Sequence, residues 1–446
     1  MTHTTIIIKK EIKEMLTPGS VASVLLMVVL FAGMGGLIGG EVEKAATLPE
    51  FGIVAEDSYE FDLRLSDGTT ERIVWNPLDY LRDVYSSESD KITILTGDDL
   101  ISEMNAQGIT NAIVLPDAQT FERMMESHEQ AEIRQYYIYE PTGMFGSVSS
   151  TVMGTIVSYL NADLSKLMIE KGDLSDYEFA ITPLSTPKDS VNTIVNGESY
   201  SGISPYDISN EINSQTMMIP LVIMIIITMI GSMVISSMGN EKENKTLETL
   251  LTLPIKRTSI VGGKILAAAI VGLVYGVVYM IGMSFYMNSL MGSASGASSV
   301  DLASIGMSLD LMDWILVAIS MFMAIVCALG MCMVLGAFSK NYKSAQTMTL
   351  PLSIMALVPM FVIMFTGWYG CGSALQGICF VIPFSHPMMA MQALMNGDIM
   401  LVASGIAYMA AFAIAMILIT VRIYNSDILI TGLGQNKWVQ KLTKSR

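Results

Sequence analysis

The stretch EKENKTLETLLTLPIKRTSIVGGKILA, residues 241–267, decides how this chain is organised. It is a dense cluster of charge between two long apolar runs, because residues 217–238 and residues 265–290 carry no charged side chain. A short polar segment between two membrane-spanning helices has to lie in water at a membrane surface. Five of its side chains are basic, and an excess of Lys and Arg is typical of cytoplasmic loops. We therefore predict that residues 239–264 form a cytoplasmic loop.

This loop has the pattern of a short amphipathic helix. Thr246 is placed to cap the turn that follows it, and Pro254 ends the helix because proline has no backbone N–H. The apolar side chains at helical spacing are Leu247, Leu250 and Leu251. Thr258 or Ser259 then caps a second helix that continues into the next span. The loop is either an ordinary polar connection or a helix on which a cytoplasmic partner docks.

The loop also carries an ordered set of motifs: Glu-x-Glu, Thr-Leu-Glu-x-Leu-Leu, Pro-Ile and Gly-Lys. In this order it resembles the first cytoplasmic loop of ABC transporter permeases of the ABC-2 type, and more narrowly it is similar to NatB-like sodium-efflux proteins. The matching positions are Glu241, Glu243, Thr246, Leu247, Glu248, Leu250, Leu251, Pro254, Gly263 and Lys264. One position departs from the pattern, since Lys245 stands where the family often has Gly.

The resemblance implies partners as well as a fold. In that family the loop inserts into a cleft of a separate ATPase subunit, which would carry ATP and Mg²⁺, so no cofactor is expected in this chain. A second permease copy is implied too, as a homodimer or a related heterodimer. The positions that the resemblance assigns to ATPase docking are Glu241, Glu243, Thr246, Leu247, Glu248, Leu250, Leu251 and Pro254. The chain is not expected to be an enzyme, because it has no G-x-x-x-x-G-K-[ST] phosphate-binding loop.

Charged side chains are distributed unevenly along the 446 residues of the chain. Hydrophobic residues make up 52% of it. Residues 41–214 hold 31 Asp or Glu and 10 Lys or Arg, a balance of −21, whereas the remainder has a balance of +5. This distribution excludes a nucleic-acid-binding protein, which needs a basic surface. The three histidines are far apart in the sequence, so no metal site built from histidine is expected.

Apolar runs of about 18 residues or more are long enough to cross a bilayer. They predict an α-helical polytopic membrane protein of the cell (plasma) membrane. Its six transmembrane helices are expected at 20–40, 212–238, 265–290, 314–338, 345–370 and 402–421. An interfacial helix over 1–19 precedes them, and a tail over 422–446 follows. With both termini cytoplasmic, all 15 basic residues outside 41–214 fall on cytoplasmic segments. The alternative for the N-terminus is the basic region of a signal peptide, but the apolar run lacks an A-x-A-like cleavage site.

Residues 41–211 predict a large extracellular α/β domain between spans one and two, with a partly parallel sheet. Strands are expected at Phe51–Ala55, Arg72–Trp75, Lys91–Thr96, Asn111–Leu115 and Arg134–Tyr139. Helices are expected at Asp98–Asn105, Asp117–Glu132 and Ser147–Lys171, the last either packed on the sheet or lying at the membrane surface. No catalytic motif occurs in this domain. Its acidic surface either concentrates cations or keeps the domain soluble.

The apolar segment 371–399 is interrupted by prolines. Pro383, Phe384 and Pro387 lie in a motif similar to the PF-x-P element of the same family. Broken backbone survives in hydrocarbon only where protein or water satisfies it, so we predict an outer re-entrant segment of two short helices. A seventh span is the alternative, but it would place the C-terminal lysines outside. The two cysteines of this segment, Cys371 and Cys379, are either bridged or free and buried.

These observations predict the membrane-spanning permease subunit of an ABC exporter. The resemblance suggests Na⁺ as the exported substrate, whereas drugs, peptides or lipids fit the Met-rich spans as well. Two other classes stay open, a mechanical or sensory membrane protein that does not transport, and an ion-coupled carrier or channel. The last is disfavoured because no predicted span has a charged residue at mid-depth, where such carriers usually place one.

Overall fold

The computed structural model describes most of the chain between residues 50 and 424. The described residues are 29, 33, 50–65, 67–86, 89–97, 99–141, 147–172, 177–246, 249, 262–265, 267–272, 274, 277–278, 281, 300–339 and 341–424. The predicted interfacial helix 1–19 and the tail beyond Tyr424 lie outside the described residues. So does the first predicted span, apart from two helical positions, Val29 and Gly33.

The chain folds into two compact units. The sheet unit comprises residues 40–213 together with 298–306, and the helical unit comprises 1–39, 214–297 and 307–446. The boundary falls inside a helix, α8 (Pro205–Thr216).

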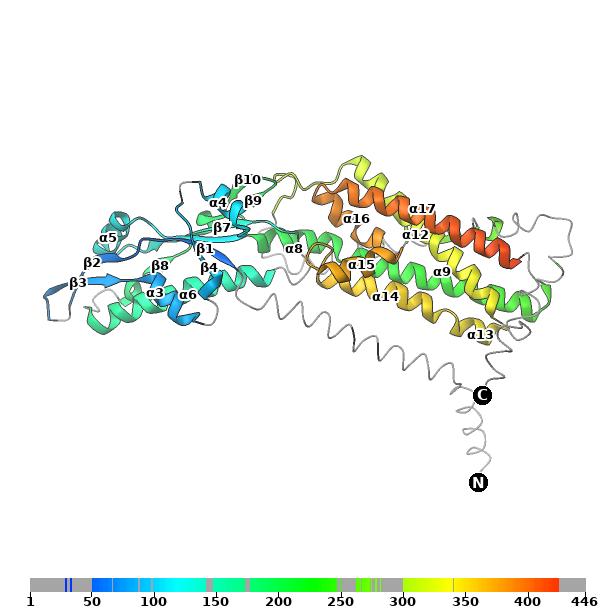
Figure 1. The fold of residues 1–446 in the computed structure, drawn as a ribbon, viewed down its shortest axis with the longest axis horizontal. Coiled ribbons are helices and arrows are strands. Elements are labelled where there is room, and N and C mark those ends of the chain that lie inside the picture. The colour runs from blue at the N-terminus through cyan, green and yellow to red at the C-terminus, as the bar shows by residue number, and fades with distance from the viewer. Residues whose placement is uncertain are drawn as a thin grey trace, which may run out of the picture. The chain divides into compact units, whose positions relative to one another are not determined.

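A six-stranded mixed sheet forms the frame of the sheet unit, in the order β10-β9-β7-β5-β1-β4 (Figure 1). Its strands are β1 (Phe51–Val54), β4 (Ile92–Ile94), β5 (Asn111–Val114), β7 (Arg134–Ile138), β9 (Val191–Val195) and β10 (Glu198–Ser201). β4, β1 and β5 are parallel neighbours, β7 is antiparallel to β5, and β9 is parallel to β7. The sheet is thus partly parallel, as the alternation of strands and helices predicts.

Among the described residues, two further strand pairs and the helices α3 to α7 accompany this sheet. The pairs are β2 (Tyr59–Arg64) with β3 (Thr70–Trp75) and β6 (Ala131–Glu132) with β8 (Leu184–Ser185). The helices are α3 (Pro77–Val84), α4 (Leu100–Gln107), α5 (Ala118–Ser127), α6 (Ser147–Lys171) and α7 (Tyr177–Ile181). Single 3₁₀ turns lie at Ser89–Lys91 and Lys188–Ser190. The predicted strand over 91–96 is therefore shorter than expected, because Lys91 closes the first of these turns.

Alternation along the strands gives the sheet unit a core on each face. Phe51 and Ile53 of β1 point into the larger core, which also contains Phe121 of α5 and the buried face of α6. Gly52 points the other way, where an added Cβ would lie 2.2 Å from Cδ1 of Leu95. A glycine is needed at this position because Leu95 fills the second core at that point.

The buried face of α6 decides between the two alternatives for this helix. Ile156, Leu160 and Leu164 are fully buried in the larger core, and Nε1 of Trp75 donates a hydrogen bond to Oδ2 of Asp163, 2.9 Å away. Three such apolar side chains contribute on the order of 1.5–3 kcal/mol each. α6 therefore packs on the sheet unit.

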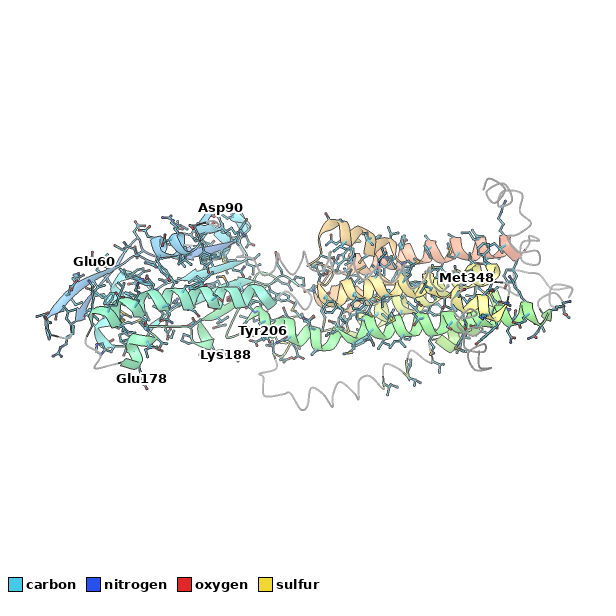
Figure 2. The ribbon with its side chains drawn as sticks, turned by 90° about the horizontal axis from the view of Figure 1, so that it is seen from below. Glu60, Asp90, Glu178, Lys188, Tyr206 and Met348 are labelled. Atoms are coloured by element: carbon cyan, nitrogen blue, oxygen red, sulfur yellow. The ribbon has the colours of Figure 1, made fainter. Side chains whose placement is uncertain are left out.

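Acidic side chains cover the surface of the sheet unit, where Glu60, Asp90 and Glu178 are all exposed (Figure 2). Arg72 pairs with three carboxylates at once, those of Glu60, Asp62 and Glu122, at 2.9–3.3 Å. Within the described residues, no group of three or more His, Cys, Asp or Glu is arranged to hold a metal ion.

The described part of the helical unit is built from long apolar helices and shorter helices that connect them. They are α9 (Met218–Glu243), α12 (Leu311–Phe338), α13 (Tyr342–Thr347), α14 (Leu350–Phe365), α15 (Ser373–Val381), α16 (Ser385–Met395) and α17 (Ile399–Tyr424). Four helical segments of the described chain are long and apolar enough to cross a membrane: Pro205–Glu243, Leu311–Phe338, Tyr342–Phe365 and Ile399–Tyr424. They coincide with predicted spans two, four, five and six. Of the third predicted span, the structure describes an apolar helix over 262–272 and scattered residues to 281.

α12 lies at the centre of this unit, where it packs against α9 and α17 (Figure 1). Its contact with α17 is close at Gly330, where an added Cβ would lie 2.7 Å from Cβ of Met416. Small residues let helices approach closely in a membrane, where dispersion contacts rather than the hydrophobic effect hold helices together.

Candidate coupling site at the end of α9

The predicted docking residues lie at and beyond the C-terminal end of α9. Glu241, Glu243 and Thr246 are among the described residues. The other predicted docking positions, Leu247, Glu248, Leu250, Leu251 and Pro254, lie outside them. The contacts described below are therefore those at the base of the loop, where the predicted loop leaves and re-enters the helical unit.

Lys242 joins the end of α9 to the end of α12. Its Nζ donates hydrogen bonds to the carbonyl oxygens of Ala337 and Ser339, the second at 2.9 Å. The last carbonyl groups of a helix lack partners within the helix, and a cation there is favoured by about 0.3–1 kcal/mol through the helix dipole. In the sequence Lys242 is recognisable only as a charge, because no local pattern points to carbonyl groups 95 and 97 residues away.

Glu243 joins the end of α9 to the start of α13. Its Oε2 accepts a hydrogen bond of 3.1 Å from the backbone N–H of Tyr342. Asn341 caps the same helix through a reciprocal pair of hydrogen bonds with Ser344. Within the described chain, the carboxylate of Glu243 thus satisfies an orphan N–H of the chain itself.

Gly239 makes the contact between α9 and α13 possible. A Cβ at this position would lie 2.6 Å from Cβ of Ala345, 3.0 Å from the carbonyl oxygen of Asn341 and 3.1 Å from Cα of Tyr342. Two of these three atoms belong to backbone, which no side-chain rotation can move. The helices therefore touch here with almost no space between them.

An ion pair closes the base of the loop. Nζ of Lys264 contacts Oε2 of Glu241, and both side chains are only about a quarter exposed, at 25% and 28%. These two residues are the first and last positions of the family-like motif, so the pair ties together the points where the loop begins and ends. Since the pair is partly shielded from water, it is screened less by salt than a surface pair.

The turn after α9 differs in one respect from the sequence prediction. Thr246 was expected to cap the next helix, but its Oγ1 donates to the carbonyl oxygen of Glu241 at 3.0 Å, and Thr246 is itself helical. The carbonyl of Lys245 accepts from the backbone N–H of Thr249 at 3.3 Å. Lys245 has φ of 58°, a left-handed conformation that favours glycine. A glycine at this position would adopt the same conformation without a side-chain penalty.

The predicted re-entrant segment contains two short helices, α15 and α16, which meet at Pro383. Phe384 is fully buried between them, and Nε2 of His386 lies 3.0 Å from the carbonyl oxygen of Phe380. The hydroxyl of Ser385 donates to the carbonyl oxygens of Cys379 and Ile382 at 2.5 and 2.7 Å. Side chains of the chain itself thereby satisfy the broken backbone, as the hydrocarbon interior of a membrane requires.

The possible disulfide is not formed in the structure. Cys371 and Cys379 are both buried thiols outside any disulfide, and they share one apolar cluster with Val362 and Leu375. The two thiols act there as small apolar side chains.

The carboxyl edge of the parallel strands is a second place where a ligand site is expected in an open α/β sheet. Here the chain fills that edge itself. The carboxylate of Glu103 accepts hydrogen bonds from the backbone N–H groups of Thr96 and Gly97 at 3.0 and 3.2 Å. These bonds, with one from the hydroxyl of Thr96, hold the pKa of Glu103 below its usual value. The hydroxyl of Tyr59 donates to the carbonyl oxygen of Pro116 at 3.1 Å.

Comparison with known proteins identifies one family. The model of the family described as "ABC-2 family transporter protein" matches residues 19–422. No match is found among curated proteins or among solved structures. The family match covers both the base of the loop and the re-entrant segment, so the geometry above belongs to the matched region.

Proposed function

The chain belongs to the ABC-2 family of transporter proteins, and we propose that it is an exporter subunit driven by a separate ATPase that docks on residues 241–264. Membership of the family makes it a membrane permease subunit of an ABC transporter. The finer proposal concerns where the ATPase binds, what the docking moves and what is carried. One observation carries it: the end of α9 is held by three neighbouring elements at once.

These contacts make the base of the loop a joint. Lys242 holds the end of α12, Glu243 and Gly239 hold the start of α13, and Lys264 holds the end of the loop at Glu241. A displacement of the docked loop therefore moves α9, α12, α13 and the helix over 262–272 together. Closure of the ATPase subunits on ATP would tilt these helices and switch the central path from inward-facing to outward-facing.

The proposed orientation follows from charge. The joint contains or adjoins Lys242, Lys245, Lys264 and Lys343, which the positive-inside rule assigns to the cytoplasm. The acidic sheet unit is then extracellular and both termini are cytoplasmic, in the plasma membrane. A second copy of the permease completes the transporter, because an ATPase dimer offers two docking clefts.

For the substrate we propose Na⁺, on the likeness of the loop to NatB-like proteins. Drugs, peptides and lipids are the alternatives. A flux assay separates them: the permease and its ATPase are reconstituted in vesicles, and ATP-dependent movement of ²²Na⁺ is compared with movement of a fluorescent amphiphile. Movement of the amphiphile alone would replace the sodium proposal. ATP hydrolysis without movement of either solute would favour a mechanical or sensory protein.

The docking role needs a variant that leaves the joint intact. Glu248→Lys reverses a charge in the loop and leaves the residues of the joint, Glu241, Lys242 and Glu243, unchanged in sequence. We expect it to reduce stimulation of the ATPase at least about tenfold, which corresponds to about 1.4 kcal/mol of coupling. The matched control is Glu198→Lys, which makes the same charge reversal at an exposed position of the sheet unit. Equal stimulation by both variants would contradict docking at this loop.

A further inference from the structure

A groove of about 290 Å³ opens in the helical unit beside the Glu241–Lys264 ion pair. It lies between α9, α12 and the helix over 262–272, and its walls are mostly methionine and aliphatic side chains. Met233 of α9 is 49% exposed and Val271 is 40% exposed, so the groove is open along one side. At membrane depth, this open side faces acyl chains or another apolar surface.

The groove has one polar end. Among the described residues that line it, Glu241, Lys264 and Ser237 are polar, and the first two also form the ion pair at the base of the loop. An apolar trough that ends in charge matches an amphiphile lying parallel to the helices. Its volume is at the lower limit of ligand pockets, which hold about 300–1,000 Å³. It therefore fits part of one acyl chain rather than a bulky ligand.

The two charged side chains have unused hydrogen-bonding capacity. An ammonium group has three donors and a carboxylate has about four acceptor sites, and among the described residues the side chains of Lys264 and Glu241 hydrogen-bond to each other and to no third side chain. Lys264 can therefore donate to a further anion while Glu241 accepts from a further cation. The pair is neutral as a whole, so its charge complements a zwitterion better than an anion, which Glu241 would repel.

We propose that this groove binds one phosphatidylethanolamine molecule. Part of one acyl chain fills the trough, the phosphate accepts from Lys264, and the primary ammonium donates to Glu241. A phosphatidylcholine headgroup carries no N–H and cannot make the second contact. The bound lipid bridges α9 and the helix over 262–272, and so reinforces the joint. This inference does not depend on the proposed ATPase or substrate, because lipid binding requires neither.

The test measures lipid retained by the full-length protein. The protein is equilibrated with equal amounts of phosphatidylethanolamine, phosphatidylcholine and phosphatidylglycerol, purified in mild detergent, and analysed by native mass spectrometry. We expect one retained phosphatidylethanolamine, favoured about tenfold over each competitor. Glu241→Gln should abolish the preference over phosphatidylcholine, and Lys264→Gln should reduce retention of both lipids.

A volume variant locates the site. Ala267 lines the groove and is exposed, whereas Ile270 lies on the same helix, is 55% exposed and does not line it. Ala267→Phe should prevent retention, and Ile270→Phe should leave it unchanged. Equal retention by these two variants, no preference among the three lipids, or selective retention of phosphatidylglycerol would each overturn the proposal. If Ala267→Phe does not fold, the two charge variants still decide, because they add no volume.

Discussion

Replacing Gly239 with alanine tests whether α9 and α13 form a rigid contact. The added Cβ would lie 2.6 Å from Cβ of Ala345, whereas ordinary contact begins at 3.4 Å, so α13 has to retreat by about 0.8 Å. Two of the three crowding atoms are backbone atoms, of Asn341 and Tyr342, so the helix itself must move. Overpacking of this kind costs about 1–3 kcal/mol, and alanine recovers about 0.5–1 kcal/mol of helix propensity.

Taken at the middle of both ranges, the expected net loss is about 1 kcal/mol. For a unit of 150–250 residues, this corresponds to a fall in Tm of about 2–4 °C per kcal/mol. Thermal unfolding of the full chain in nanodiscs measures it, with Gly377→Ala in α15 as the control, because a Cβ there meets nothing within 4 Å. The retreat also stretches the bond between Glu243 and the N–H of Tyr342 beyond hydrogen-bonding distance. A Tm for Gly239→Ala equal to that of Gly377→Ala would refute the close contact.

Three further predictions concern other positions. Lys245→Gly should raise the Tm of the helical unit by about 2–4 °C, because a left-handed residue with a side chain costs roughly 1 kcal/mol. Leu164→Ala should lower the free energy of unfolding of the sheet unit by about 2–5 kcal/mol, because Leu164 is fully buried. Proteolysis at increasing urea concentrations measures this loss. Glu103→Gln should destabilise the sheet unit near neutral pH but not in acid. The native pKa of Glu103 is depressed, so its stabilisation is present above the unfolded pKa of about 4.3 and is lost as pH falls through the native pKa.

Each of these has an outcome that counts against it. Lys245→Ala keeps the side-chain penalty and should not raise the Tm, so a rise equal to that of Lys245→Gly would point to charge instead of conformation. A loss below about 1 kcal/mol for Leu164→Ala would remove α6 from the core. A stability difference between wild type and Glu103→Gln that stays constant from neutral pH to about pH 2 would show that the Glu103 carboxylate contributes nothing.

The sequence predicts the long elements well because their signals are local. Charge-free runs give α12 and α17 almost at their observed bounds, and the prolines give the break between α15 and α16. One local signal was missed. Asn196 and Gly197 have φ of 53° and 87° and connect β9 to β10, and Asn-Gly is a strong hairpin signal.

The joint itself could not be predicted from the sequence. The partners of Lys242 are 95 and 97 residues away, and those of Glu243 and Gly239 about 100. Such contacts depend on which helices become neighbours, and neither hydrophobic period nor capping pattern encodes that pairing. Charge identifies the loop in the sequence, and the family resemblance assigns Glu241 and Glu243 to docking. In the structure both residues hold the base of the loop together.

The most direct measurement is site-specific photocrosslinking in intact cells. A photoreactive amino acid replaces Thr249, which is exposed in the loop, or Glu198, which is exposed on the sheet unit, and the adducts are identified by mass spectrometry. The account predicts that position 249 crosslinks to an ABC ATPase subunit and that position 198 does not. An ATPase adduct at position 198, or none at position 249 while the transporter hydrolyses ATP, would contradict it.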